Sequence, residues 1–221
     1  DINIWSEGLN DINTYIIGLI ASDGCIYLDK KQNRNMLNIT SKDYKLIEYL
    51  NNLMTPSKKI YENKGSFSII YKNDEALNYI ISLGISYRKS LTLKFPYIPD
   101  EFFWSFMRGY FDGDGCIYKS HNNGHDYMFV SITSGSLDIL MTIQDKLLKY
   151  DIHARINKDC RKDTFYLKIY KQKDVSIFAE NMYKNAQLFL GRKRERFNIF
   201  LGPLYFHYSS IKMYSNLYRK I

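Results

Sequence analysis

Two stretches of this chain have the hydrophobic pattern of helices, one near the start and one near the middle. The first, DINTYIIGLIAS, is apolar on almost every face, which is typical of a buried helix. The second is PDEFFWSFMRGYFDG, and each stretch has an aspartate placed to cap its first turn, Asp11 or Asp100. Each also contains a glycine, Gly18 or Gly109, which costs a helix interior about 1 kcal/mol relative to alanine. The pattern predicts two helices whose backbones approach each other closely.

The same succession of elements follows each helix. Alternating apolar and polar residues predict two strands joined by a polar turn, and both second strands end in Ile-Thr-Ser, at residues 39–41 and 132–134. Apolar residues at helical spacing come next: Ile47, Leu50 and Met54 in the first copy, and Leu140, Ile143 and Leu147 in the second. A second hairpin and a further helix complete each copy. The order α-β-β-α-β-β-α is therefore written twice, with a join near residues 95–99.

This repeat predicts an α+β protein built from two pseudo-symmetric units, residues 1–98 and residues 99–221. We expect the units to pack through their first helices, with antiparallel sheets on either side that together form a saddle. The second unit ends in an aromatic and basic tail after Phe197. Two copies are too few for a solenoid, so a packed pair is the expected arrangement.

Composition narrows the class of partner. The net charge of +8 and the pI near 9.2 favour a polyanionic partner such as nucleic acid. No apolar run is long enough to span a membrane, and no signal peptide is visible. The three cysteines, Cys25, Cys116 and Cys160, are too far apart for a zinc cluster, and their odd number argues against a disulfide framework. We therefore expect an intracellular protein, in a bacterial or phage cytoplasm or in an organelle.

The pentapeptide Asp-Gly-Cys-Ile-Tyr occurs twice, at residues 23–27 and 114–118, where the two predicted helices end. Helices packed side by side would bring Asp23 and Asp114 together, although carboxylates at helix C-termini are disfavoured by each other and by the helix dipoles. A divalent cation compensates this repulsion, and oxygen ligands suit Mg²⁺ or Mn²⁺. An acidic metal centre in a basic protein is suited to phosphodiester hydrolysis. An isolated Asp-Gly is usually only a turn, but its recurrence after two matched helices favours a site.

IIGLIASDG at residues 16–24 and MRGYFDGDG at residues 107–115 resemble the paired nine-residue motifs of the LAGLIDADG homing endonucleases. The chain is similar to the single-chain members with two repeats, which cut long asymmetric DNA sites as monomers. It departs from the usual motif at Ala-Ser in residues 21–22 and at Tyr-Phe in residues 110–111. The resemblance implies a site-specific double-strand DNA endonuclease that leaves short 3′ overhangs. It also implies Mg²⁺ as the cofactor, with Mn²⁺ or Ca²⁺ able to occupy the site.

The resemblance implies roles in the reaction for six residues. Two carboxylates would bind the metal ions, the backbone carbonyls before them would complete the site, and a late basic residue in each repeat would act near the scissile phosphate. The carboxylates would be those of Asp23 and Asp114, and the carbonyls those of Ser22 and Gly113. The basic residues would be Lys89 and Lys193. Asp112 has Ala21 at the equivalent position of the other repeat, so we expect Asp112 to be structural.

The predicted sheets offer a surface for reading double-stranded DNA. A twisted antiparallel sheet presents alternate residues to a duplex, and basic, amide, hydroxyl and tyrosine side chains suit base edges and phosphates. The expected DNA contacts are Tyr27, Asp29, Lys31, Arg34, Asn38, Thr40, Lys64, Tyr118, Ser120, Ser131, Thr133, Arg155, Asn157, Arg161, Lys162 and Lys168. The two copies differ in these residues, which implies a non-palindromic target.

Two other functions are compatible with the same scaffold. One is an intron maturase that binds its intron RNA, and the other is a DNA-binding regulator that has lost catalysis. Both acidic residues of the motif are retained, and 221 residues leave no room for the helix-turn-helix domain usual in such regulators, so the endonuclease is favoured. No protein-splicing blocks surround the core, which favours a free-standing or intron-encoded enzyme over an intein.

Overall fold

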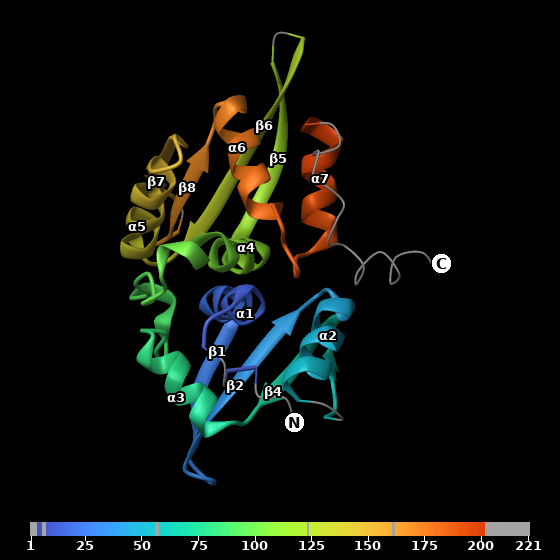
Figure 1. The fold of residues 1–221 in the computed structure, drawn as a ribbon, viewed down its shortest axis with the longest axis vertical. Coiled ribbons are helices and arrows are strands. Elements are labelled where there is room, and N and C mark those ends of the chain that lie inside the picture. Colours follow the sequence, from blue (N-terminus) through green and yellow to red (C-terminus); the bar gives the residue numbers. More distant parts are fainter. Residues whose placement is uncertain (1–3, 6–7, 56–57, 123, 161, 202–221) are drawn as a thin grey trace, which may run out of the picture.

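Two similar units stack along the long axis of the molecule, and a pair of helices meets between them (Figure 1). The computed structural model describes residues 4–5, 8–55, 58–122, 124–160 and 162–201. The tail after residue 201 lies outside the described residues. Each unit contains one four-stranded antiparallel sheet, with strand order β1-β2-β4-β3 in the first and β5-β6-β8-β7 in the second.

The predicted order of elements is confirmed in both units. The first contains α1 (Asp11–Ser22), β1 (Gly24–Asp29), β2 (Arg34–Ser41), α2 (Tyr44–Met54), β3 (Tyr61–Asn63), β4 (Ser66–Tyr71), α3 (Asp74–Ser82) and a short 3₁₀ helix, η1 (Lys89–Leu91). The second contains the 3₁₀ helix η2 (Asp100–Phe102), α4 (Phe103–Asp114), β5 (Gly115–Asn122), β6 (His125–Ser134), α5 (Leu137–Leu148), β7 (Ala154–Lys158), β8 (Phe165–Ile169), α6 (Gln172–Tyr183) and α7 (Gly191–Leu201). Helix α7, which carries Lys193, is much longer than η1, which carries the matching Lys89 in the first unit.

The expected helix caps are wrong in both copies. The N-cap of α1 is Asn10, whose side chain accepts from the amides of Ile12 and Asn13 in a capping box. Asp11 instead turns its carboxylate across the interface to the guanidinium of Arg108. Asp100 opens η2 rather than α4, and its carboxylate pairs with Lys146 of α5 and with Lys149, which follows that helix. Both aspartates therefore stabilise tertiary contacts, which a local capping rule does not capture.

One face of each sheet is covered by helices and the other face is open. Helices α2 and α3 pack on the first sheet, and α5 and α6 pack on the second. The strand residues predicted to point into the core are buried there: Ile26, Ile39, Ile117 and Ile132. Because side chains alternate along a strand, the neighbouring residues lie on the open faces. No helix among the described residues is both long and apolar enough to cross a membrane.

Helices α1 and α4 pack against each other through their glycines, as predicted. A Cβ atom added at Gly18 would lie 2.7 Å from the Tyr110 amide nitrogen and closer still to the Phe106 carbonyl oxygen. A Cβ added at Gly109 would lie 2.9 Å from the Leu19 amide nitrogen. These neighbours are backbone atoms, which cannot rotate away as a side chain can. Only a residue without a side chain fits at either position.

Gly18→Ala and Gly109→Ala should each destabilise the protein strongly. Overpacking costs about 1–3 kcal/mol where side chains can adjust, and a clash with backbone belongs at or above the upper end of that range. The measurement is the thermal unfolding midpoint, with Asn52→Ala on the exposed side of α2 as the control. A midpoint that matches the control for either glycine variant would contradict this account of the interface.

Candidate active site

The ends of the two motif helices touch. Asp23 is the C-cap residue of α1, and Asp114 is the last residue of α4. A Cβ atom added at Gly113 would lie 2.6 Å from Ser22 Cβ and 3.1 Å from Asp23 Oδ2, so the first motif packs directly on the backbone beside Asp114. The four residues expected to form a metal site are therefore brought together from two helices that are separated by a whole repeat.

The two carboxylates are partly desolvated, and none of the described residues forms an ion pair with either of them. Burial raises the pKa of the Asp114 carboxyl to about 6, and the negative charge of Asp23 adds to the shift. Asp23 is exposed as a residue, but the protein around its carboxyl group removes part of its hydration and raises its pKa. Among the described residues, no side chain forms an ion pair or hydrogen bond with either carboxylate. This pair would gain from a cation placed between its members.

The donor set fits a hard divalent cation. Among the described residues no group of three or more His, Cys, Asp or Glu side chains gathers into a metal site. The centre therefore offers two carboxylates and nearby backbone carbonyls, an all-oxygen set that leaves coordination positions for water or a phosphate. Mg²⁺ prefers this arrangement, because it keeps several waters and takes one or two carboxylates. Soft ligands that would favour zinc are not part of this set.

Both predicted lysines are buried beside the motif ends. Lys89 is 7% exposed and donates to the Gly24 carbonyl at 2.6 Å, and Lys193 is 5% exposed and donates to the Gly115 carbonyl at 2.7 Å. Burial lowers the pKa of both amines, that of Lys193 to about 8. Neither lysine is an ordinary surface residue, and each ammonium is held at the backbone that follows a motif aspartate.

The charges of these lysines act across the boundary between the repeats. After the effect of burial, the largest influence on the pKa of Asp23 is the positive charge of Lys193, which lowers it. For Lys89, after burial, the largest influence on its pKa is the negative charge of Asp114, which raises it. The strongest charge influence on Lys89 thus comes from the opposite repeat, whereas Lys193 interacts most strongly with Asp112 of its own repeat and more weakly with Asp23. The two halves form one electrostatic centre rather than two isolated ones.

A family model described as a LAGLIDADG-like domain matches the chain twice, over residues 10–91 and 102–183. These matches contain both motif helices, both sheets and all the helices from α1 to α6. The chain belongs to the LAGLIDADG-like domain family. Its two repeats correspond to the two matched segments.

Solved LAGLIDADG structures share this fold. The meganuclease I-SmaMI bound to uncleaveable DNA is 14% identical, with a TM-score of 0.59 over 86% of this chain and 89% of that one. The homing endonuclease I-DmoI is 17% identical, with a TM-score of 0.59 over 80% of this chain and 97% of that one. I-SmaMI has also been crystallised on uncleaved DNA with calcium ions, and an I-DmoI variant on its target DNA with magnesium.

A curated relative extends the comparison to sequence. The probable translation initiation factor IF-2 of Methanocaldococcus jannaschii is 26% identical over 198 residues, which cover 83% of this chain. The chain spans only 16% of the length of that relative. The similarity therefore concerns one segment of a much longer protein.

The strand register places most of the expected DNA contacts on the open faces of the LAGLIDADG sheets. In the first sheet, Cys25 pairs with Asn38 and Ser68 pairs with Thr40, which puts these residues on one face with Tyr27 and Asp29. In the second sheet, the expected contacts that share the open face are Tyr118, Ser120, Ser131, Thr133, Arg155, Asn157 and Lys168. Lys168 is surrounded by rings, with its Nζ 4.6 Å from the centroids of Tyr118 and Phe129.

Of the five other expected contacts, three lie in turns or loops, one lies outside the described residues, and one lies on a strand but is paired within the protein. Lys31 and Lys64 lie in hairpin turns, Lys162 lies in the loop between β7 and β8, and Arg161 is not among the described residues. Arg34 is on a strand, but its guanidinium pairs with Asp74 at 3.1 Å. Strand alternation does not extend into turns, which is why these positions were harder to predict.

Sequence reasoning gave no role to Arg192 or to the buried Arg108 of α4. Arg192 is exposed directly beside Lys193, and its charge is among those that lower the pKa of Asp23. Arg108 and Asp112 are 1% and 2% exposed and lie on one side of α4. An arginine four residues before an aspartate in an otherwise apolar helix was the signal that could have revealed this pair. Asp112 was expected to be structural, and it is buried with hydrogen-bonded partners.

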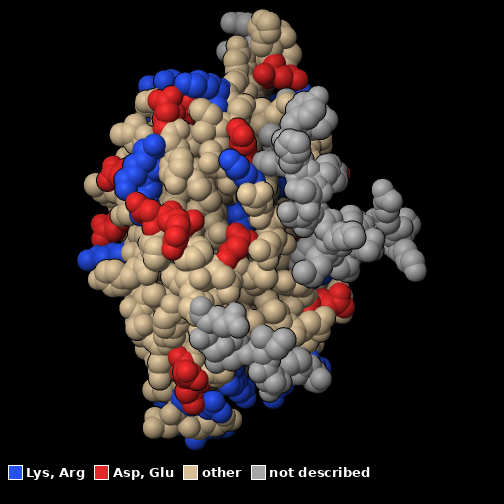
Figure 2. Space-filling model, viewed as in Figure 1, with Lys and Arg blue, Asp and Glu red and all other residues tan. Residues whose placement is uncertain are grey.

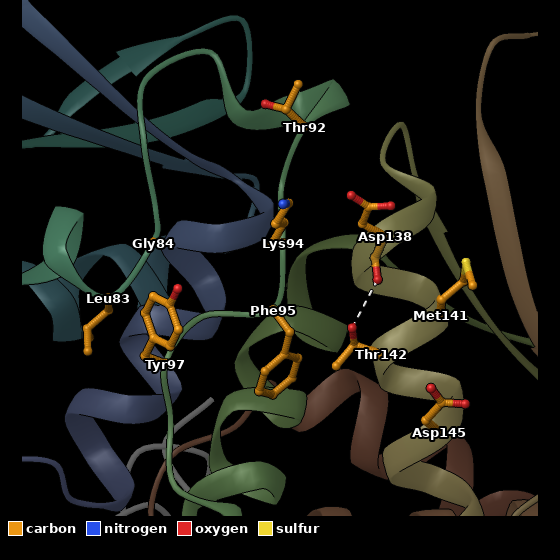
Figure 3. Close-up of a pocket in the computed structure, with 10 residues that line it drawn as sticks. All are labelled: Leu83, Gly84, Thr92, Lys94, Phe95, Tyr97, Asp138, Met141, Thr142 and Asp145. Carbon is orange, nitrogen blue, oxygen red and sulfur yellow. Dashed lines mark hydrogen bonds between the residues drawn. The ribbon is translucent and has the colours of Figure 1, made fainter.

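Two surface features are separate from this site. A cavity of about 620 Å³ lies between the connector of the repeats and α5 (Figure 3). It is lined by Tyr97 and Met141 among others, and the hydrogen bond drawn in it, from Thr142 to the Asp138 carbonyl, is internal to α5. None of the motif aspartates or buried lysines lines it. Figure 2 shows acidic and basic side chains interspersed over one face, so the net positive charge is not gathered there into one patch.

Because Lys89 and Lys193 are buried, we expect their amines to be protected from chemical modification. An amine-reactive acetylating reagent should modify Lys89 and Lys193 far more slowly than the exposed Lys64 and Lys162. A lowered pKa speeds acylation of an accessible amine, so slow modification reports restricted access. Mass spectrometry of peptides from a time course measures the rates. Modification of either buried lysine at the rate of the exposed pair would show that its amine is free.

Proposed function

We propose that this protein is a site-specific DNA endonuclease that hydrolyses one phosphodiester bond in each strand of a long asymmetric duplex and leaves short 3′ overhangs. The observation that carries the proposal is the contact between two helix ends, each of which carries an aspartate whose carboxylate forms no ion pair with any described residue. A buried lysine flanks each end. Within this proposal residues 1–98 and 99–221 form the two repeats, and the protein acts as a monomer.

In the proposed mechanism Asp23 and Asp114, with the carbonyls of Ser22 and Gly113, hold Mg²⁺, for which Mn²⁺ or Ca²⁺ can substitute. When bound, the cation stabilises negative charge on the phosphate and lowers the pKa of water. Lys89 and Lys193 keep positive charge beside the same centre. Preorganised charge of this kind stabilises the extra negative charge of a phosphodiester transition state. The protein thus supplies both the cation ligands and a fixed electrostatic environment.

DNA would lie along the open faces of the two sheets, with the motif ends between the half-sites. The open faces of the two sheets carry different residues at matching positions. Lys168 pairs with Ser131 in the second sheet, and Ile70 pairs with Asn38 at the matching position of the first. A charged group in one half and an apolar group in the other would read different sequences. An asymmetric target follows from this difference.

Two alternatives share the scaffold and remain outcomes of the test. A maturase would bind its intron RNA more tightly than any duplex, and a regulator would bind duplex DNA without cutting it. Similarity to one segment of a translation factor is also what an endonuclease domain carried inside a host protein would produce, so the intein setting stands beside the free-standing and intron-encoded ones. The proposed chemistry is the same in each setting.

The direct test is selection from a randomised duplex library. The protein is incubated with the library in Mg²⁺, and the cut ends are captured and sequenced. We expect enrichment of one long non-palindromic sequence with short 3′ overhangs. Recovery of no enriched ends, together with tight RNA binding, would favour the maturase. Recovery of no ends with retained duplex binding would favour the regulator.

Asp23→Asn and Asp114→Asn should each abolish double-strand cleavage and leave nicking at most. The amide keeps the shape of the side chain but removes the charge that a cation requires. Cleavage of a supercoiled plasmid that carries the selected site separates nicked from linear product. Binding measured in Ca²⁺ shows whether the variants still dock, and Asp138→Asn at an exposed position of α5 is the matched control. Full linearisation by both motif variants would rule out these carboxylates as the metal ligands.

Lys168→Met should weaken duplex binding and reduce its salt dependence. Each lysine that neutralises a phosphate contributes a slope of about 1 in the plot of log affinity against log salt concentration. Methionine keeps the packing against the rings of Tyr118 and Phe129 without the charge. Fluorescence anisotropy across a salt series measures the slope, with Lys173→Met on the helix-covered side as the control. An unchanged slope would place Lys168 away from the DNA backbone.

A further inference from the structure

The two buried lysines are held in different ways. Lys193 Nζ donates to the carbonyls of Phe111, Asp112 and Gly115, and these three acceptors use all three N–H groups of an ammonium. Lys89 Nζ has one short contact, at 2.6 Å to the Gly24 carbonyl, and a second at 3.5 Å to the Ser22 carbonyl. A distance of 3.5 Å is at the limit of a hydrogen bond. Lys193 is therefore fixed from three directions, and Lys89 mainly from one.

Asp112 holds the chain that carries Lys193 at two points. Its Oδ2 accepts from the Leu190 amide at 2.8 Å, three residues before the lysine. Its backbone carbonyl accepts from Lys193 Nζ, also at 2.8 Å. Tyr15 of the first repeat donates its hydroxyl to the same Oδ2 at 2.8 Å. The Asp112 side chain thus ties the start of α7 to α4, and Tyr15 orients that side chain from across the interface between the repeats.

Arg108, one helical turn before Asp112, anchors the segment that leads to α7. Its guanidinium donates to the carbonyls of Met182 and Leu188 and pairs with Asp11. Arg108 and Asp112 on α4 therefore form hydrogen bonds with backbone groups of the last turn of α6 and of the segment between α6 and α7. Such backbone contacts determine where the first turn of α7 begins.

The first repeat has no equivalent of this contact. The motif alignment places Ala21 at the position of Asp112 and Ile17 at the position of Arg108, and neither side chain can accept or donate a hydrogen bond. Lys89 lies in the short helix η1, directly after Arg88 in a left-handed conformation with φ of 51°. The position of the first lysine is thus set by a local turn, and that of the second by a buried carboxylate.

We propose that Asp112 is a positioning residue for Lys193. As a result, cleavage of the two DNA strands depends on different parts of the fold. The strand whose cleavage requires Lys193 also requires Asp112, whereas the strand whose cleavage requires Lys89 does not. This inference rests on the proposed endonuclease function. It predicts that Asp112, the sixth residue of the second motif, affects cleavage of one DNA strand more than the other. A purely structural residue would not have this preference.

The test follows cleavage of each strand separately, on a selected duplex labelled at both 5′ ends. Lys193→Met and Lys89→Met first define which strand depends on each lysine. Asp112→Ala should then slow the Lys193-dependent strand by about 10- to 100-fold, the range expected when a reacting group is displaced by a fraction of an ångström to one ångström. The other strand should be slowed much less, so that a nicked intermediate accumulates with the Lys193-dependent strand intact.

The conservative variant separates position from charge. The Leu190 amide and the Tyr15 hydroxyl both donate to Oδ2, and Oδ1 has no hydrogen-bond partner among the described residues. Asp112→Asn can therefore present its amide oxygen to both donors, and it should restore cleavage of both strands. An Asp112→Asn variant as impaired as Asp112→Ala would show that charge, not position, is what matters, and would overturn the proposal.

A stability control excludes a general effect. Ile143→Ala opens a cavity in the core under α5, away from α7, and should lower the unfolding midpoint without preference for either strand. Equal slowing of both strands by Asp112→Ala would make Asp112 a structural residue only. If Asp112→Ala does not fold, Tyr15→Phe removes one of the two donors to the same oxygen. It should slow the same strand to a smaller extent, and no strand preference in Tyr15→Phe would also overturn the proposal.

A second readout does not need cleavage. Under an amine-reactive reagent, Asp112→Ala should raise modification of Lys193 several-fold while Lys89 stays protected, and Asp112→Asn should leave both protected. Equal protection of Lys193 in the wild type and in Asp112→Ala would overturn the positioning role. A wild type that cuts neither strand but shows the expected labelling would instead refute the endonuclease function and leave the role of Asp112 in holding Lys193 intact.

Discussion

The close contact between the backbones of α1 and α4 is the constraint on which the rest of the structure depends. Gly18 and Gly109 allow it, because any Cβ atom there would meet backbone of the opposite helix. The contact brings the two helix ends together, and with them Asp23 and Asp114. It also places one sheet on each side of the helix pair (Figure 1). A wider separation would divide the acidic centre into two distant carboxylates.

A second layer of structure breaks the symmetry that the glycines establish. Asp11, Tyr15, Arg108 and Asp112 form hydrogen bonds within and across the helix pair, and three of them are almost fully buried. Buried polar groups are costly unless they are partnered, so a network in which most of these groups are hydrogen-bonded favours one arrangement over others. Burial raises the pKa of the Asp112 carboxyl, which the charge of Lys193 partly opposes. Its groups on α4, Arg108 and Asp112, have the apolar residues Ile17 and Ala21 at the matching positions of α1, so the second repeat is not a copy of the first.

The order of the elements and the buried faces of the strands were predictable, because the local spacing of apolar residues indicates both. Strand residues such as Ile39 and Ile132 occupy alternate positions, and alternation decides which face is buried once one face carries helices. The sequence predictions failed where a side chain interacts with a residue far away in the chain. Asp11 satisfies every local rule for an N-cap, yet Asn10 caps α1 and Asp11 pairs with Arg108, which is 97 residues away. Arg34 follows the strand pattern but pairs with Asp74.

The sequence by itself determined the two repeats, their order of elements, the helix contact and the candidate carboxylates, because each of these is carried by residues close together in the chain and written twice. It also singled out Lys89 and Lys193 through their matching positions. Only the tertiary structure decided that these lysines are buried, that their charges act across the boundary between repeats, and that Asp112 holds one of them. Those properties arise from contacts between residues 65 to 82 positions apart, whose geometry depends on packing rather than on local pattern.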